Sequence, residues 1–293
     1  MRIGVVFPQT EIGADRGAVR AYTERVEELG FTHLLAYDHV LGADPEVHSP
    51  WRGPYDVDTT FHEPFVLFGY LAAISELELV TGIIILPQRQ TALVAKQAAE
   101  VDLLTLGKLR LGVGLGWNAV EYEALNESFT NRGRRIEEQI AVMRALWTQE
   151  VVDFKGRWHR IDRAGLDPLP VQRPIPIWMG GGWDRQKRAL VEPSARRIAR
   201  IADGWFTHVP ANEDSRAVMQ AFRRLVEEEG RDPATFPVEG RLPAAKSGAE
   251  EWKRGIDMVR QLGMTSVELN TMGAGYRALD EHLEALRRFK ELV

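Results

Sequence analysis

Asp38 and His39 stand side by side at the end of a short apolar run, and their side chains can do acid–base chemistry. His39 has the side chain whose ordinary pKa lies closest to neutrality, so it can polarise a carbonyl or a cofactor ring, or donate a proton. A structural pair with no part in chemistry is the alternative. We take Asp38 and His39 as the candidate catalytic residues.

A run of three glycines, Gly180, Gly181 and Gly182, predicts an anion-binding turn. It ends a short strand, and we expect a helix capped by Asp184 to follow, which would point free backbone N–H groups and the positive end of the helix dipole at an anion. Basic side chains follow closely: Arg185, Lys187 and Arg188. The alternative is that the glycines only permit a tight turn.

A second glycine pattern, Gly112, Gly114 and Gly116, leads into Trp117. The first two glycines match the dinucleotide-binding G-x-G-x-x-G motif, but Trp117 stands at its third glycine, which argues against a doubly wound open sheet. A tryptophan cannot transfer a proton, and Glu121 is the nearest carboxylate that could do so. Trp117 is expected to shape an apolar pocket with other aromatic residues: Trp51, Tyr55, Phe61 and Trp205.

These residues need elements that hold them in place, and the clearest elements lie within residues 79–122. Residues 79–86 are almost continuously apolar and β-branched, which predicts a strand covered on both faces. From Thr91 the apolar residues recur with a helical period until Gly107. Residues 109–113 predict a second buried strand, so the segment is a strand–helix–strand unit of a parallel sheet.

The whole chain of 293 residues repeats this alternation, with eight expected strands each followed by a helix. The pattern predicts an α/β protein of the (β/α)8 TIM-barrel class, a single domain over residues 1–293. An insertion is expected at about residues 148–176, with a small hairpin and a proline-rich stretch. Two helical pieces separated by Pro193 are expected after the triple glycine.

In such a barrel the carboxyl ends of the strands meet on one rim, where the active site lies. Several polar and aromatic residues follow expected strands, or belong to the long loop 41–63. We expect a substrate pocket on this rim, formed by Gln9, Trp51, Trp117 and His208.

The next helix after Gly116 is expected over residues 130–147, with Glu137 and Glu138 on its solvated side. The long loop 41–63 is expected to act as a lid over the bound ligand, because its aromatic residues alternate with Gly, Pro and Asp.

Composition excludes some functions and favours a cellular location. The chain has no cysteine, which excludes disulfides, thiolate catalysis and sulfur-ligated zinc, and its net charge is −5, without a basic face for nucleic acid. No apolar run approaches the length of a membrane span or of a signal-peptide core. We expect a soluble, cytoplasmic protein that acts on a small molecule, without nucleic-acid or membrane partners.

Several motifs together resemble the luciferase-like monooxygenase superfamily, and within it the branch that uses the deazaflavin coenzyme F420. They are the stretch T-x-x-x-AK-x-AAE-x-D-x-L-x-x-G-K-L-x-LGVG-x-GW-x-x-x-E at residues 91–121, DH at 38–39, RR at 134–135, PIPIWMGGG at 174–182 and ADGWF at 202–206. They occur in the family's order over nearly the whole chain.

The resemblance implies a barrel that binds F420, or alternatively FMN, at its rim, transfers a hydride to or from a small organic substrate, and forms a homodimer. It also implies a non-prolyl cis peptide between Gly82 and Ile83, against the cofactor ring. The implied cofactor-binding residues are Asp38, Gly82, Ile83, Gly114, Trp117, Met179, Gly180, Gly181, Gly182 and Arg185.

Two departures from the family pattern affect these expectations. Members that oxidise sugar phosphates have an acidic glutamate where Trp117 stands, so that activity is not expected here. The extra residues around Pro193 leave the anion contacts of the glycine turn open.

Three other functions were weighed. The first is an FMN-dependent monooxygenase that uses reduced flavin and oxygen, and the second is a non-catalytic flavin-binding barrel. A metal-dependent hydrolase would use Asp38, His39, His62 and His208, but Pro8 and Gln9 stand where such barrels carry an H-x-H pair, and no metal is expected.

Overall fold

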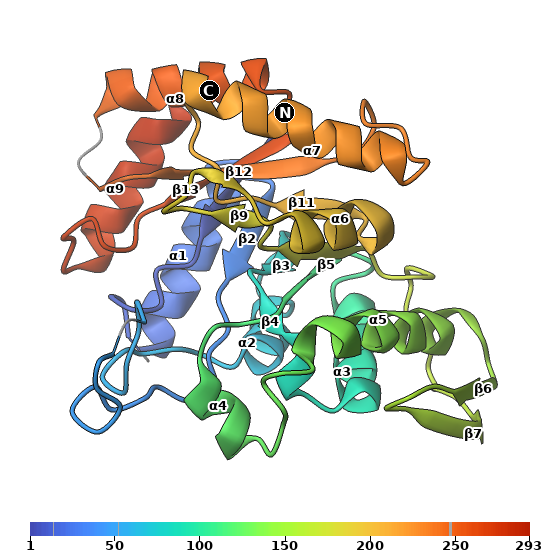
Figure 1. Ribbon diagram of the computed structural model, residues 1–293. Helices are drawn as coiled ribbons and strands as arrows, with labels where there is room; N and C mark the ends of the chain where they lie inside the picture. The colour runs from blue at the N-terminus through green and yellow to red at the C-terminus, as the bar shows by residue number, and fades with distance from the viewer. Residues whose placement is uncertain (14, 52, 246–247) are drawn as a thin grey trace. The chain divides into compact units, whose positions relative to one another are not determined.

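The computed structural model describes residues 1–13, 15–51, 53–245 and 248–293. Its chain forms two compact units, one built from Met1–Ala36 with Ile177–Val293 and the other from Tyr37–Pro176 (Figure 1). We call them unit 1 and unit 2. Unit 1 is made of two separate stretches of sequence, whereas unit 2 is one continuous stretch.

In the described part of unit 1, six strands form a parallel sheet in the order β2-β1-β13-β12-β11-β8. The strands of this sheet are β1 (Arg2–Val6), β2 (His33–Ala36), β8 (Ile177–Gly180), β11 (Gly204–Phe206), β12 (Val238–Pro243) and β13 (Ser266–Asn270). The helices are α1 (Arg16–Glu28), α6 (Glu192–Ile201), α7 (Arg216–Glu228), α8 (Ala249–Gln261) and α9 (Leu279–Lys290), with the short 3-10 turn η2 (Glu213–Ser215). A two-stranded hairpin, β9 (Trp183–Asp184) and β10 (Ala189–Leu190), follows β8.

Unit 2 contains three further parallel strands, since both β3 and β4 pair with β5. Its strands are β3 (Glu78–Thr81), β4 (Ile84–Ile85), β5 (Leu109–Gly114) and the antiparallel pair β6 (Val152–Lys155) and β7 (Arg160–Ala164). Its helices are α2 (Pro64–Leu71), α3 (Thr91–Leu104), α4 (Ala119–Ala124) and α5 (Arg132–Thr148), with the 3-10 turn η1 (Leu86–Gln88). No helix in the described part of the chain is long and apolar enough to cross a membrane.

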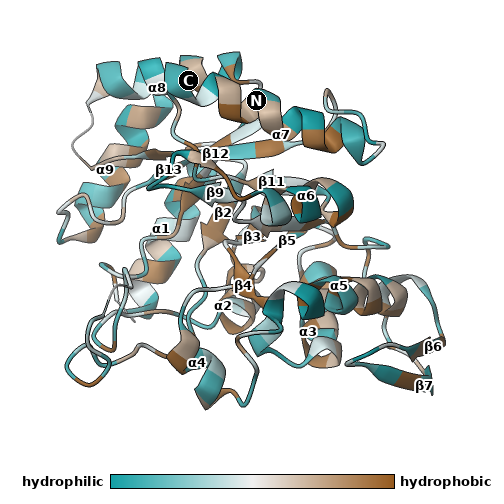
Figure 2. Ribbon diagram, in the orientation of Figure 1, coloured by the Kyte–Doolittle hydropathy of each residue, from teal (hydrophilic) through white to brown (hydrophobic). Residues whose placement is uncertain are grey.

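The hydrophobic pattern of the sequence explains these elements. All six residues of β5 are buried, as expected of a strand that is covered on both faces. Apolar residues on α7 recur at helical spacing, and Met219, Phe222 and Val226 are buried on one stripe (Figure 2). Burying such stripes against the strands supplies most of the stability of an α/β protein.

Helix termini follow the predicted signals at α1 and α3. Asp15 caps α1 by accepting a hydrogen bond from the N–H of Gly17 at 2.8 Å, and Gly30 takes a left-handed conformation after its end. Gly107 does the same after α3, with φ of 84°. The predicted hairpin of the insertion is confirmed as β6 and β7.

Three expectations about elements are wrong. Residues 79–86 are not one strand, because β3 and β4 are separated by Gly82 and Ile83, whose peptide bond is cis as predicted. The short helix α4 was missed. Before Pro193 there is the β9–β10 hairpin and not a helix, and Pro193 lies in the first turn of α6, where its missing N–H costs nothing.

Asp184 does not cap a helix, contrary to the expectation from the sequence. Its carboxylate accepts hydrogen bonds from the N–H groups of Gln186 and Lys187 within the hairpin turn, at 2.9 and 3.0 Å. An aspartate that closes a turn and one that caps a helix give the same local sequence signal, since both accept from N–H groups two or three residues ahead.

Candidate functional site

The candidate catalytic pair follows β2 in the chain and belongs to unit 2. Asp38 is buried, and its carboxylate accepts hydrogen bonds from the backbone N–H of Ile85 at 3.1 Å and from the Arg89 guanidinium at 2.7 Å. Arg89 also donates to Glu63 at 2.9 Å. Burial alone would lower the pKa of Arg89, but the two carboxylates outweigh it and raise that pKa, so Arg89 stays a cation between Asp38 and Glu63.

Gln139 fixes the turn that carries Arg89. The side-chain N–H₂ group of this buried residue of α5 donates to the carbonyl oxygens of Leu86 and Arg89 and to the hydroxyl of Thr91, at 3.0 to 3.2 Å. A second bond, from the Trp147 indole to the carbonyl of Ala95 at 2.9 Å, ties α5 to α3. Asp38 is therefore held by a guanidinium whose own backbone is hydrogen-bonded in place.

His39 pairs with Glu121, which is fully buried on α4. The Nδ1 atom of His39 lies 3.4 Å from a carboxylate oxygen of Glu121, and the same carboxylate accepts from the N–H of Val40 at 2.5 Å and from Gln88 at 3.2 Å. Burial alone would raise the pKa of Glu121, but these hydrogen bonds outweigh it and lower the pKa. Glu121 is thus a carboxylate at neutral pH, a hydrogen-bond acceptor for His39 and not an acid.

The short helix α4 positions Glu121. Its N-cap residue, Asn118, accepts a hydrogen bond from the N–H of Val120 at 3.1 Å and donates to the carbonyl of Leu41 at 3.4 Å. The Tyr122 hydroxyl donates to the carbonyl of Leu115 at 2.7 Å. Asn118 therefore joins the start of α4 to the loop that begins at His39, and Tyr122 closes the turn between β5 and α4.

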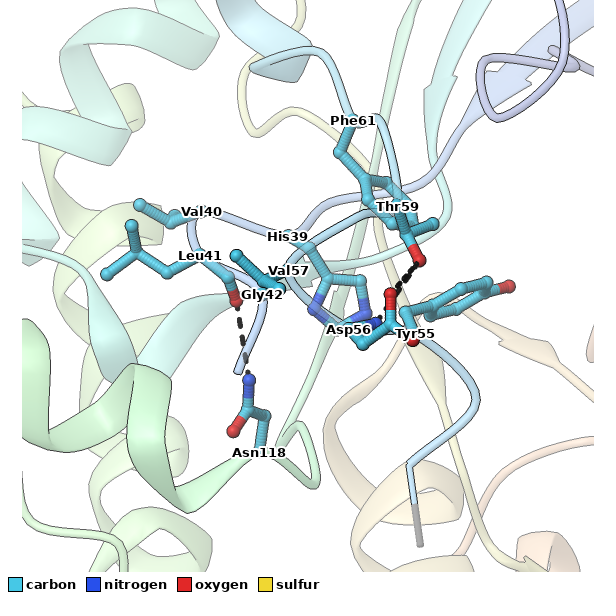
Figure 3. Close-up of a pocket in the computed structure, with 10 residues that line it drawn as sticks. All are labelled: His39, Val40, Leu41, Gly42, Tyr55, Asp56, Val57, Thr59, Phe61 and Asn118. Atoms are coloured by element: carbon cyan, nitrogen blue, oxygen red, sulfur yellow. Dashed lines mark hydrogen bonds between the residues drawn. The ribbon is translucent and has the colours of Figure 1, made fainter. Parts of the chain in front are cut away.

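A cavity of about 270 Å³ in unit 2 has the imidazole of His39 in its wall (Figure 3). Tyr55 and Phe61 from the long loop lie against this ring, with ring centroids 5.3 and 4.9 Å away. The ring centroid of Trp117 lies 5.5 Å from that of His39. The pocket thus combines an acid–base group and aromatic rings with polar residues in the same wall: Asp56, Thr59 and Asn118.

The expected aromatic partners in unit 2 come together around Trp117. Trp51 lies 5.4 Å from it between ring centroids, and Gly53 is packed so closely that a Cβ there would lie 2.1 Å from the Trp117 ring. Arg52, between them, lies outside the described residues. Gly114 is the last residue of β5, while Gly82 and Ile83 are half-buried between β3 and β4.

The expected residues of unit 1 lie in three places. Met179 and Gly180 end β8, and Gly181 and Gly182 follow with φ of 112° and 77°, a conformation that favours glycine. Gln9 is fully buried after β1. Arg185 and His208 line a separate cavity of about 490 Å³.

The glycine turn packs against the first turn of α6. The Trp205 indole donates to the carbonyl of Gly181 at 2.8 Å, and the N–H of Val191 donates to the carbonyl of Gly182 at 2.9 Å. A Cβ on Gly181 would lie 3.5 Å from the hydroxyl of Ser194. The helix N-terminus that these glycines contact is therefore the start of α6. It is not a helix that begins at Asp184.

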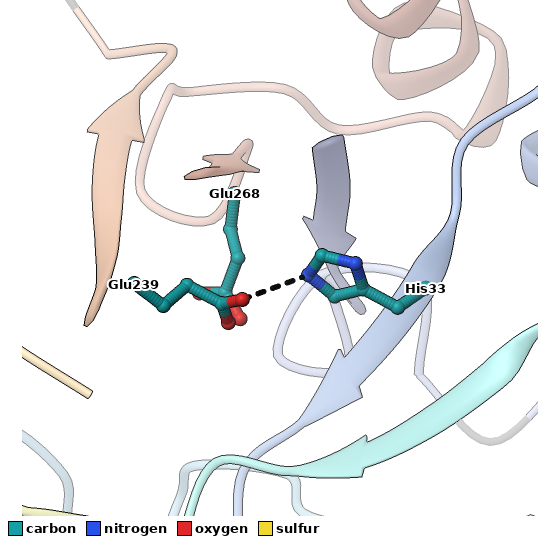
Figure 4. A group of neighbouring side chains, drawn as sticks. All are labelled: His33, Glu239 and Glu268. Carbon is teal, nitrogen blue, oxygen red and sulfur yellow. Dashed lines mark ion pairs between the residues drawn. The ribbon is translucent and has the colours of Figure 1, made fainter. Parts of the chain in front are cut away.

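A buried polar cluster of unit 1 was not predicted. His33 Nε2 lies 3.3 Å from Glu239, which accepts from Ser266 at 2.5 Å, and Glu268 accepts from Arg241 at 2.8 and 3.0 Å (Figure 4). Burial first, and the neighbouring Glu239 second, raise the pKa of Glu268 well above its ordinary value against the opposing effect of Arg241. The two carboxyl groups therefore hold a proton between them.

His33, Glu239 and Glu268 are also the one trio of potential metal ligands found among the described residues. The trio contains none of the four residues weighed for a metal-dependent hydrolase. The guanidinium of Arg241 already neutralises charge at this trio, so a cation would have to compete with it.

Sequence reasoning missed Gln88, Arg89 and Arg241. Gln88 and Arg89 follow the short strand β4, whereas Arg241 lies within β12. Polar residues that follow a strand reach the rim of an α/β sheet, so for Gln88 and Arg89 this position was the available signal, as it was for Asp38 and His208.

Comparison with known proteins identifies the family. Residues 1–288 match the family model of the luciferase-like monooxygenases, so the chain belongs to that family. An uncharacterised protein of Mycobacterium bovis is 32% identical over 239 residues, which are 80% of this chain and 77% of that protein.

Relatives with described activities use reduced FMN or F420. An FMNH2-dependent dimethylsulfone monooxygenase of Pseudomonas fluorescens is 34% identical over 168 residues, 56% of this chain and 43% of that protein. Among solved structures, monooxygenase RslO1 of Streptomyces bottropensis has a TM-score of 0.78 at 19% identity, over 100% of this chain and 98% of that one. An F420-dependent secondary alcohol dehydrogenase has a TM-score of 0.75 at 17% identity, with the same coverage.

These likenesses establish the fold class and the broad chemistry. The chain is a (β/α)8 TIM barrel and an oxidoreductase of the luciferase-like family, whose members use a flavin or a deazaflavin. The prediction of the superfamily is confirmed.

Proposed function

We propose that the protein transfers a hydride between coenzyme F420 and a small organic substrate, with His39 as the group that exchanges a proton with the substrate. The observation that carries this proposal is the pairing of His39 with the buried carboxylate of Glu121 in the wall of an aromatic pocket. A carboxylate behind a histidine holds the ring in one orientation.

The residues present fit the cofactor that the family implies. Gly181 is half-buried beside Ser194 at the start of α6, and the positive end of a helix dipole favours a phosphate. Gly82, Ile83 and Gly114 stand at strand ends of unit 2, and we propose that they lie against the cofactor ring, with Asp38 and Trp117 beside it. The deazaflavin, when bound, supplies or accepts the hydride.

In the reductive direction, a carbonyl carbon of the substrate gains the hydride and its oxygen gains the proton of His39. The C=O π bond becomes a C–O–H group, so the substrate is reduced by two electrons and the cofactor is oxidised by two. Tyr55, Phe61 and Trp117 exclude water from the reacting carbon.

The test is anaerobic mixing of the protein with reduced F420 and a carbonyl or activated alkene acceptor, followed by absorbance of the oxidised chromophore. We expect the chromophore to return, and His39→Ala to slow its return by roughly a hundredfold, as for a lost general acid. Glu121→Gln keeps the shape but removes the charge, and should slow the return with little change in KM. Glu123→Gln changes an exposed residue of the same helix and is the matched control.

An FMN-dependent monooxygenase is the second candidate, favoured by the likeness to the dimethylsulfone monooxygenase. Oxygen-dependent product formation with reduced FMN, and no reaction with F420, would establish it in place of hydride transfer. Titrating the protein with both cofactors compares their affinities directly. If the protein bound a cofactor but turned over with no acceptor, both proposals would be wrong and the barrel would be a binding protein.

A further inference from the structure

The cavity of about 490 Å³ in unit 1 has a charge pattern that the proposed function does not explain. It lies where β11, β12 and β13 end, since Thr207, Pro243 and Asn270 are part of its wall. Arg185, His208 and Arg241 line it too, and among the described residues none that lines it is acidic. The carboxyl ends of barrel strands are where substrates bind.

We propose that this cavity binds the oxyanion of a small organic ligand, a carboxylate or a phosphate. The inference goes beyond the proposed function, and the anion site does not depend on hydride transfer.

Two arginines at different depths form the anion site. Arg185 comes from the exposed β9–β10 hairpin, and Arg241 rises from β12 with 17% of its side chain exposed. The Arg241 guanidinium pairs with Glu268 at 2.8 Å and also lines the cavity. A guanidinium has five N–H donors in a fixed fork, so one that a carboxylate holds in place can also donate to a ligand oxyanion.

The pKa of His208 reflects the positive potential of the cavity. Desolvation first, and then the charges of Arg241 and Arg185, lower its pKa to about 4. Because the residue is exposed at the cavity wall, we give more weight to the two charges than to desolvation. His208 is therefore neutral at pH 7, and its ring can donate one hydrogen bond to an anion that the arginines attract.

The test compares three small ligands of one shape by isothermal titration calorimetry at fixed ionic strength: benzoate, phenyl phosphate and the uncharged benzamide. We expect at least one of the two anions to bind about tenfold or more tightly than benzamide, which corresponds to about 1.4 kcal/mol. Tighter binding of phenyl phosphate than of benzoate would indicate a ligand that carries a phosphate. Tighter binding of benzoate would indicate a ligand that carries a carboxylate.

Arg185→Gln should remove most of this preference, because the residue is exposed and its loss leaves the fold intact. Lys187→Gln removes the same charge from the same hairpin, at a side chain that is 81% exposed and does not line the cavity, and should keep the preference. Equal binding of the anions and benzamide, or an unchanged preference in Arg185→Gln, would overturn the proposal.

A competition experiment separates a ligand other than the cofactor from the cofactor itself as the source of the anion. Saturating F420 should leave benzoate binding in place, whereas loss of benzoate binding would assign the cavity to the cofactor's anionic tail and contradict our inference. If the anion preference holds but reduced F420 transfers no hydride to any acceptor, the proposed function fails and the anion site stands.

Discussion

At the scale of single residues, the shared proton of Glu268 and Glu239 makes stability depend on pH. The pKa of Glu268 is raised in the fold above its ordinary value of 4.5. A carboxyl group with a raised pKa contributes stability that is complete below the unfolded pKa and is lost as pH rises through the folded one.

We therefore predict that the free energy of unfolding of the wild-type protein falls as pH rises above about 4.5, and that Glu268→Gln reduces this fall, because glutamine stays neutral. Urea unfolding at several pH values measures it. Glu250→Gln, at an exposed position of α8, is the control and should follow the wild type. Parallel curves for wild type and Glu268→Gln would show that the two carboxyl groups do not share a proton.

At the scale of elements, Glu138 joins the β6–β7 hairpin to α5. Its carboxylate accepts hydrogen bonds from the N–H groups of Arg157, Trp158 and His159, each at 2.8 Å, and contacts the His159 ring. The sequence predicted Glu138 on the solvated side of its helix. That prediction was wrong because helical spacing identifies the face of a residue but not a separate loop that covers this face.

Glu138→Ala should detach the hairpin locally, since three N–H groups, two part-buried and one exposed, would lose their acceptor, at a cost of at most about 1–3 kcal/mol for each part-buried group. We expect faster hydrogen exchange over residues 152–164 with little change in global unfolding. Burial alone would raise the pKa of Glu138, but its hydrogen bonds lower it, so this anchor is present above the ordinary pKa of 4.5 and weakens as pH falls below it. Glu137→Ala, one residue away, is the control, and equal exchange in both variants would contradict the anchoring role.

The long loop after His39 provides a second prediction for an element. Gly53→Ala would place a methyl group 2.1 Å from Trp117 and 2.7 Å from Trp51, so the loop must move away from the pocket wall. If this loop is a lid, KM for the acceptor should rise several-fold while F420 affinity stays nearly unchanged. Gly69→Ala, with open space around its Cβ position in α2, is the control. A loss of F420 binding instead would place the loop in the cofactor site.

How far the sequence predicted these elements depended on their length and regularity. The apolar stripe of α3 spans four turns, so it was predicted nearly to the residue, whereas α4 has six residues and its stripe is too short to recognise. Asp38 and His39 could be selected because they follow a strand. Their partners Arg89 and Glu121 are distant in sequence, and no local pattern links residues across 51 or 82 positions.

At the scale of the whole molecule, the predicted homodimer stays a prediction, and α3 offers a way to test it. Leu93 and Leu104 are 52% and 53% exposed and lie on one face of this helix, since eleven residues make about three turns. Exposed leucines in register are typical of a surface that another chain covers.

If that face forms the dimer, Leu104→Glu should convert dimers to monomers in sedimentation velocity, because a charge would be buried without a partner. Val47→Glu changes an exposed apolar residue of the long loop and should leave the dimer intact. A monomeric wild-type protein, or a dimer that survives Leu104→Glu, would exclude this face as the interface.

The split of unit 1 into two stretches of sequence affects how the protein is made on the ribosome. Strand β1 lies beside β13, with Arg2 opposite Ser266. The hydrogen bonds of β1 therefore cannot be complete until β13 has been synthesised. At cellular rates of translation this wait is on the order of tens of seconds. During it, β1 can pair only with β2 and keeps one edge open, and open strand edges are where nascent chains associate wrongly. We therefore expect slow translation anywhere between residues 37 and 265 to reduce the yield of folded protein more than equally slow translation of residues 271–293.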